Sequence, residues 1–211
     1  MATEDRRPRG TPRKSILLRV SAELFAARGF HAVSIDEIGH AAGISGPGVY
    51  RHFTNKADIL LHLCHAAMDD LLAGTREISE SGSSGTGRVD ALVVLHVDFA
   101  VRERAILAVY LREQMELAPR ELRALRSRQR EYEQVWIDAL RAVANLAPGQ
   151  ARAAVKLLLS MLNGTAHIRD PVSRSQLVDL LTRMAGGALD EIGVRITPVN
   201  GDPSEKQRPT G

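Results

Sequence analysis

The sequence contains a single cysteine, Cys64, in 211 residues. One cysteine excludes an intrachain disulfide and argues against a thiolate metal cage, which fits a reducing compartment such as the cytoplasm. No run of about 18 apolar residues is present, so no membrane span is expected. The N-terminus mixes arginines with acidic residues and does not have the pattern of a signal peptide. We therefore expect a cytoplasmic protein with no membrane partner.

The common catalytic motifs are also missing. The sequence has no G-x-S-x-G, no P-loop and no glycine-rich dinucleotide motif, and Cys64 lacks a His or Asn partner at a recognisable spacing. His62, His65 and Asp69 fall on one helical face, and His96 could assist them in binding a cation. Because no fourth ligand can be assigned, we favour ordinary polar residues there. We expect no enzyme activity, no cofactor and no metal.

The apolar residues that are present, 44% of the chain, recur with helical spacing and show no strand alternation. The sequence therefore predicts an all-α fold. Residues 1–11 are expected to be a disordered basic arm, 12–57 and 58–195 two helical domains, and 196–211 a disordered tail. The expected helices are 12–28, 34–42, 47–52, one starting near 56, 88–101, 104–115, one from 119 to before 148, 150–165 and 173–193. Glycine and serine make 79–87 the clearest internal loop.

Residues 34–56 are the most informative stretch. Ser34 and Glu37 form a capping box, and Gly43 supplies the residue that commonly closes a helix. Pro47 suits the first turn of a second, very short helix that carries Tyr50 and the two residues after it. Two short helices joined by a tight turn make a helix-turn-helix, whose second helix enters the DNA major groove. The sequence therefore predicts binding to duplex DNA.

This stretch closely resembles the signature of the TetR family of bacterial transcriptional regulators. The resemblance rests on Ala42-Gly43-Ile44-Ser45, then Val49-Tyr50-Arg51-His52-Phe53, then Lys56. It covers about the first 60 residues, and it implies an all-helical homodimer with a variable C-terminal domain that senses a small molecule. The resemblance thus makes residues 12–57 a helix-turn-helix DNA-binding domain and residues 58–195 a ligand-binding and dimerisation domain. The residues that match the family's phosphate-contacting positions are Ser34, Tyr50 and Lys56. Those that match positions near base edges are Ser45, Gly46, Pro47 and Arg51, while His52 matches either role.

One departure from the family pattern concerns direct base readout. Residues 46–48 are Gly-Pro-Gly, where relatives often carry a longer polar or basic side chain at the first position. Gly46 has no side chain with which to read a base. Upstream, the arginines and lysine of residues 1–14 outnumber Glu4 and Asp5. This basic arm is equally compatible with a phosphate or minor-groove contact and with a solubilising tail.

The last two expected helices resemble the family's dimer interface. Gly186 and Gly187 in mid-helix are costly for helix stability but allow another helix to approach closely. The expected interface residues are Leu158, Leu177, Leu180, Leu181, Met184 and Gly187. The alternative is a kinked helix end that contacts no partner.

Segments 110–116 and 128–136 loosely resemble the TetR subgroup that controls fatty-acid and sterol breakdown, in which coenzyme A thioesters are inducers. An apolar channel would hold the acyl chain, with arginines at the phosphates. The alternative is that these aromatic residues belong to an ordinary core. The candidate ligand-binding residues are Leu63, Ala67, Leu95, Phe99, Tyr110, Trp136, Leu162 and Asn163.

Together these features predict a homodimeric, ligand-responsive transcriptional regulator. In this hypothesis it is a repressor that leaves a palindromic operator when a small apolar or acyl-CoA-type inducer binds. Two alternatives stay open: a helical enzyme or ligand carrier that contains a helix-turn-helix, and an activator without an inducer.

Overall fold

The part of the chain that the structure describes is built from helices. The computed structural model describes residues 12–168 and 170–195, and within these ranges no strand occurs. The prediction of an all-α fold is confirmed. The predicted basic arm (1–11) and tail (196–211) lie outside the described residues.

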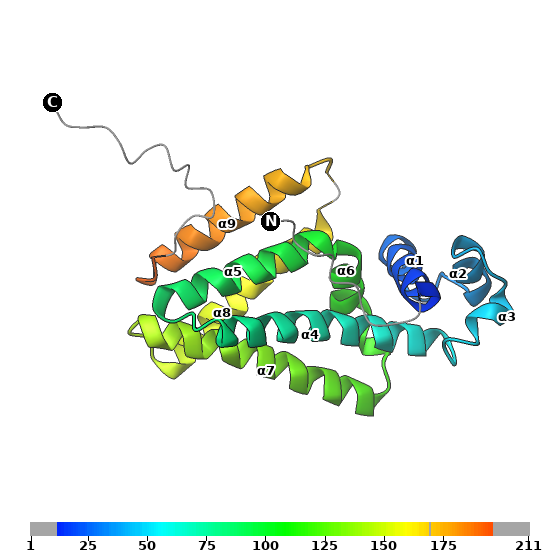
Figure 1. Ribbon diagram of the computed structural model, residues 1–211, viewed down its shortest axis with the longest axis horizontal. Helices are drawn as coiled ribbons and strands as arrows, with labels where there is room; N and C mark the ends of the chain where they lie inside the picture. The colour runs from blue at the N-terminus through cyan, green and yellow to red at the C-terminus, as the bar shows by residue number, and fades with distance from the viewer. Residues whose placement is uncertain (1–11, 169, 196–211) are drawn as a thin grey trace. The chain divides into compact units, whose positions relative to one another are not determined.

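The described ranges contain nine α-helices and two short 3-10 helices (Figure 1). No described helix is long and apolar enough to cross a membrane. In chain order the elements are α1 (Pro12–Arg28), α2 (Ile35–Ala41), α3 (Gly46–Val49), α4 (Lys56–Glu80), α5 (Gly85–Arg102), α6 (Arg104–Glu113), η1 (Gln114–Glu116), α7 (Pro119–Val143), α8 (Pro148–Leu162), η2 (Asn163–His167) and α9 (Arg174–Asp190).

Several predicted boundaries need correction. α8 spans Pro148–Leu162 and not 150–165, and α9 ends at Asp190 and not at 193. The second helix of the helix-turn-helix was expected to run to about His52, but α3 ends at Val49, and residues 50–52 form a turn closed by His52 N–H donating to the Val49 carbonyl at 2.9 Å. The predicted loop 79–87 shrinks to 81–84, because α4 continues to Glu80, where the Ser81 N–H still donates to the Glu77 carbonyl at 2.9 Å, and α5 begins at Gly85. The helix expected to reach 115 ends at Glu113 and tightens into η1.

Contacts between residues divide the described chain into two compact units. Unit 1 contains residues 12–73, 103–132 and 165–168, and unit 2 contains 74–102, 133–164 and 170–195. The three N-terminal helices thus share unit 1 with the first part of α4, with α6 and with the first part of α7. The predicted functional boundary after residue 57 stays a prediction.

In unit 1, α1 packs against both α2 and α6, and α2 packs against α3. The side chains of Leu17, Phe25, Ile38, Val49 and Phe53 are almost completely buried there. Removing one such side chain from water contributes roughly 1.5–3 kcal/mol. This apolar core holds three short helices that could not be stable alone.

In unit 2, α5 packs against α8 and α9. Phe99, Trp136 and Leu140 are fully buried. Gly74 lets the second half of α4 approach α5 closely, since a Cβ atom at this position would lie 2.3 Å from Leu95 Cδ1. A larger residue at 74 would require the Leu95 side chain to move.

Candidate nucleic-acid interface

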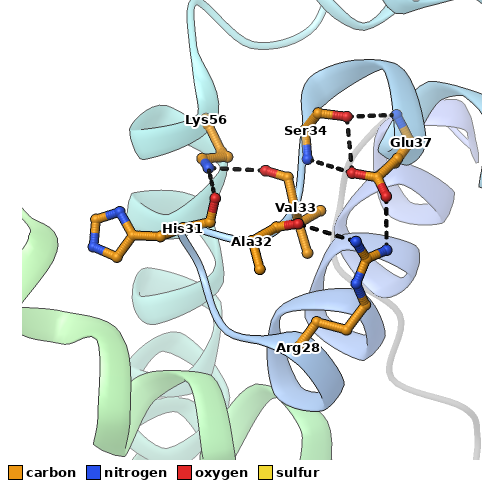
Figure 2. A network of polar contacts seen from close by, with 7 residues as sticks. All are labelled: Arg28, His31, Ala32, Val33, Ser34, Glu37 and Lys56. Atoms are coloured by element: carbon orange, nitrogen blue, oxygen red, sulfur yellow. Dashed lines mark hydrogen bonds and ion pairs between the residues drawn. The ribbon is translucent and has the colours of Figure 1, made fainter.

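The start of α2 is fixed by the predicted capping box (Figure 2). The Ser34 hydroxyl accepts from the Glu37 backbone N–H at 3.2 Å, and Glu37 Oε2 accepts from the Ser34 N–H at 2.8 Å. Arg28, the last residue of α1, donates to Glu37 Oε1 at 2.7 Å. The bond from the Ser34 backbone, together with Arg28, lowers the pKa of Glu37 to about 2. Glu37 therefore ties α1 to the start of α2.

The turn between α2 and α3 depends on glycine at two positions. Gly43 has φ of +70°, which L side chains rarely adopt. Gly39, inside α2, accepts the Ile44 N–H at 2.9 Å, and a Cβ there would lie 3.0 Å from the Ile44 carbonyl oxygen. The role of Gly43 was predicted, whereas that of Gly39 depends on how tightly the turn folds back and has no local sequence signal.

The exposed surface of α3 and the following turn is formed by a few side chains. Ser45, Pro47 and Arg51 are exposed, Tyr50 is 57% exposed, and His52 is half-buried. Gly46, in contrast, is buried against Asp36. A Cβ atom at this position would lie 1.7 Å from Asp36 Oδ1. Base-edge contact by a side chain is therefore available on either side of Gly46 but not from Gly46 itself.

Lys56 begins α4 and its ammonium group points back at the loop between α1 and α2 (Figure 2). Nζ donates to the carbonyls of Phe30 at 2.7 Å, Val33 at 2.8 Å and His31 at 3.4 Å. It also lies 4.6 Å from the centre of the Phe30 ring. An ammonium has three donors, so these bonds use its full capacity. Contact of Lys56 with a DNA phosphate stays a prediction.

Two basic residues at the start of α1 contact the DNA-binding module, by which we mean helices α1, α2 and α3 and the turn that follows α3. Arg13 donates to the Ala42 carbonyl at the end of α2 at 3.4 Å. The Lys14 ammonium lies 2.9 Å from His62 Nε2 and 5.2 Å from the Phe53 ring. Because the ammonium can only donate, Nε2 of His62 accepts this bond, while its Nδ1 lies 2.8 Å from the Asp58 carbonyl oxygen.

Farther along α4, the polar face that was weighed as a cation site has protein partners. Arg128 of α7 donates to His65 Nδ1 at 3.0 Å and to an Asp69 oxygen. Burial, followed by the charge of Arg128, lowers the pKa of His65. The face therefore joins α4 to α7 within unit 1, as the alternative of ordinary polar residues predicts.

The predicted ligand-binding residues are divided between the two units. In unit 2, Asn163 Oδ1 lies 3.0 Å from Nε2 of the buried His96, whose ring stands edge-on to Trp136. Burial lowers the pKa of His96 to about 4. Phe99 and Leu162 are also buried in unit 2, and Leu95 is half-buried. In unit 1, Leu63, Ala67 and Tyr110 are buried, and the Tyr110 hydroxyl donates to Gln129 at 3.4 Å. That all of them line one cavity stays a prediction.

The predicted dimer residues fall into two groups within unit 2. Leu158, Leu177 and Leu181 are buried within the single chain, whereas Leu180 and Met184 of α9 are 44% and 46% exposed. Gly187 is exposed too, and a Cβ at this position would have no neighbour within 4 Å. Leu157 of α8 is 73% exposed and was not among the predicted residues. It lies one position from Leu158, so only the observed rotation of α8 distinguishes the two.

Comparisons with known proteins match both parts of the chain. The family model described as bacterial regulatory proteins, tetR family, matches residues 17–63, and the model described as tetracyclin repressor-like, C-terminal domain, matches 82–167. The HTH-type transcriptional repressor KstR2 of Rhodococcus jostii (strain RHA1) is 29% identical over 157 residues, which are 74% of this chain and 77% of that protein.

Two further similarities are to a transcriptional activator and to a solved complex with DNA. The HTH-type transcriptional activator FasR of Mycolicibacterium smegmatis is 35% identical over 95 residues, 45% of this chain and 43% of that protein. The crystal structure of AibR in complex with isovaleryl coenzyme A and operator DNA has a TM-score of 0.67 at 19% identity, covering 83% of this chain and 97% of that one. With a capped helix-turn-helix followed by a helical C-terminal region, the chain belongs to the TetR family of bacterial regulatory proteins.

Proposed function

We propose that this regulator is a cytoplasmic repressor that binds a palindromic operator as a homodimer and releases it when an acyl-CoA-type ligand binds. The observation that carries the DNA-binding part is the capped helix-turn-helix with an exposed surface on α3. Its outward side chains are few, so each has a distinct role in the proposal.

Ser45, Pro47 and Arg51 face the base edges in this proposal, and Tyr50 contacts a phosphate through its hydroxyl. Arg51 is suited to guanine, whose two major-groove acceptors match a guanidinium. Pro47 offers an apolar surface to a thymine methyl group. Loss of Arg51 should cost about 1–3 kcal/mol at one base pair, whereas loss of the Tyr50 hydroxyl should weaken all sequences equally.

Dimerisation is assigned to α8 and α9. Leu157, Leu180 and Met184 leave an apolar surface on unit 2, and the open space at Gly187 would admit a helix of the second subunit. Burying this surface in an interface removes apolar side chains from water. Two recognition helices related by twofold symmetry then match half-sites one helical turn apart.

The ligand is proposed to be an acyl-CoA thioester. Support comes from the apolar candidates Phe99, Trp136 and Leu162, from Asn163 as a hydrogen-bonding group, and from the isovaleryl coenzyme A held by the similar AibR. A ligand that prefers one of two conformations by 1–3 kcal/mol would weaken operator binding about 5–150-fold.

The experiment is a selection from fragmented genomic DNA with the purified protein, followed by release of the selected operator with an acyl-CoA series. The proposal expects an inverted repeat, and release that strengthens about fourfold per added methylene, or about 0.8 kcal/mol, until the cavity is full. Absence of any inverted repeat contradicts the DNA-binding part. Flat or absent release across all chain lengths contradicts only the ligand.

A transcriptional activator is a second candidate, favoured by the similarity to FasR. A reporter gene placed behind the selected operator separates the two. A repressor lowers reporter expression when the protein is present, and an activator raises it.

A further inference from the structure

The end of α1 lies against α6, where Arg112 contacts the backbone of α1 and Glu113 contacts the backbone of Phe30 in the loop that follows. Arg112 Nη2 donates to the carbonyl of Phe25 at 2.6 Å and to that of Ala26 at 3.2 Å. The last carbonyls of a helix lack a full set of intrahelical partners; here the Phe25 carbonyl also accepts the Gly29 N–H at 2.8 Å, and a cation at this end complements the helix dipole. Arg112 thus caps α1 from another helix.

Glu113 completes the contact from the other side. The residue is only 8% exposed. Its Oε1 accepts from Arg112 Nε at 2.8 Å and from the Phe30 N–H at 3.3 Å. Adjacent residues in a helix normally face different directions. Here the two side chains meet at the end of α6, where the backbone of Glu113 has φ of −107° and ψ of −2°.

These bonds constrain α1 more than an apolar contact would. Hydrophobic packing is non-directional, whereas a guanidinium that bonds two carbonyls and a carboxylate fixes both distance and rotation. α1 in turn holds α2, because Arg28 bonds Glu37 at the start of α2 and Arg13 bonds Ala42 at its end. α2 packs against α3. Within unit 1, Arg112 and Glu113 therefore help to fix the orientation of α3 relative to α6.

From this geometry we infer that Arg112 and Glu113 are positioning residues that determine which half-site spacing the dimer accepts. The inference rests on the proposed operator binding. In a symmetric dimer, the separation of the two recognition helices follows from where each module is held on its subunit. Without the Arg112–Glu113 contact, each module can rotate, so operators with a longer or shorter spacer are bound almost as well as the best one.

The experiment uses the full-length dimer and the selected operator, together with copies that have one base pair more or less between the half-sites. Affinities are measured for the natural protein, Arg112→Ala, Glu113→Ala and Glu113→Gln. The matched control is Arg120→Gln, an exposed arginine on α7. The informative quantity is the ratio of affinities for two spacings in one preparation, because the unfolded fraction cancels in that ratio.

The alanine variants should lower this spacing ratio by about 5-fold or more. Glu113→Gln should retain most of it, because an amide oxygen can accept the same two bonds, and Arg120→Gln should not change it. If an alanine variant does not fold, Arg112→Lys decides, since it keeps the cation but loses the planar fork that bonds two carbonyls and Glu113 at once, and a fall of about 2-fold or more is expected.

Equal weakening of all three spacings would overturn the inference and would leave Arg112 and Glu113 with a purely stabilising role. An unchanged ratio in every variant would overturn it too. Failure of the natural protein to select any inverted repeat would instead contradict the proposed function, so the two failures are distinguishable.

Discussion

Replacing Lys56 by methionine separates a role in folding from a role in DNA binding. The substitution keeps the length of the side chain but removes three hydrogen bonds to the loop between α1 and α2, two of them shorter than 3 Å. A hydrogen bond to a charged group contributes about 1.5–3 kcal/mol. Because Lys56 is half-exposed, water would replace part of this loss, and we take the same 1.5–3 kcal/mol for all three bonds together. For a chain of this size that lowers Tm by about 3–12 °C.

The assay combines thermal unfolding with the salt dependence of operator binding. Each phosphate contact contributes about −0.9 to the slope of log affinity against log salt. Lys56→Met should lower Tm and leave this slope nearly unchanged, because the ammonium is already bound to carbonyls. Arg51→Ala, at an exposed position, should weaken operator binding and leave Tm unchanged. A Lys56→Met protein with the natural Tm and a slope reduced by about 0.9 would refute this reasoning and would return Lys56 to the phosphate backbone.

Three other predictions follow from single residues. Burial lowers the pKa of His96 from 6.5 to about 4, so the unfolded chain binds a proton that the folded chain does not, and the free energy of unfolding should fall as pH drops from 6.5 to 4. Urea titrations should show this slope in the natural protein and a smaller one in His96→Gln. For Glu37, the pKa lowered from 4.5 to about 2 means that its stabilisation is present above pH 4.5 and is lost as pH falls towards 2. Glu37→Gln should be less stable at neutral pH, and its deficit should vanish in acid; a constant deficit would argue against the ion pair. Met184→Arg should give a folded monomer by light scattering, because this side chain is already half-exposed in one chain, and a persistent dimer would place the interface elsewhere.

Local signals in the sequence predicted the elements whose bonds are local. The capping box at Ser34 joins residues three apart, and Gly43 sets the backbone of its own turn, so both are readable without a fold. The first helix was predicted with its observed bounds for the same reason. The end of α3 was overestimated because residues 50–52 contain no glycine or proline to mark a stop, whereas the backbone there closes into a turn.

Contacts between distant residues could not be predicted from the sequence. Glu113 bonds Phe30 across 83 positions, and Arg112 bonds Phe25 across 87. In the sequence, these two residues look like the solvated end of an amphipathic helix. Lys56 matched a phosphate-contacting position of the family, but its observed bonds reach 23 to 26 residues back along the chain. Only the tertiary structure reveals these partners.

The burial of Gly46 beneath Asp36 has a consequence for redesigning the operator preference. A library that randomises position 46 alone would mostly introduce side chains into space that the Asp36 carboxylate occupies, since even a Cβ would lie 1.7 Å from it. A side chain at 46 requires the exposed Asp36 carboxylate to turn away, so varying positions 36 and 46 as a pair, with a smaller residue on α2 for each larger one on α3, removes this conflict. Double variants of this kind would restore a side chain at a position where the natural protein has none, and they offer a route to reprogrammed genetic switches.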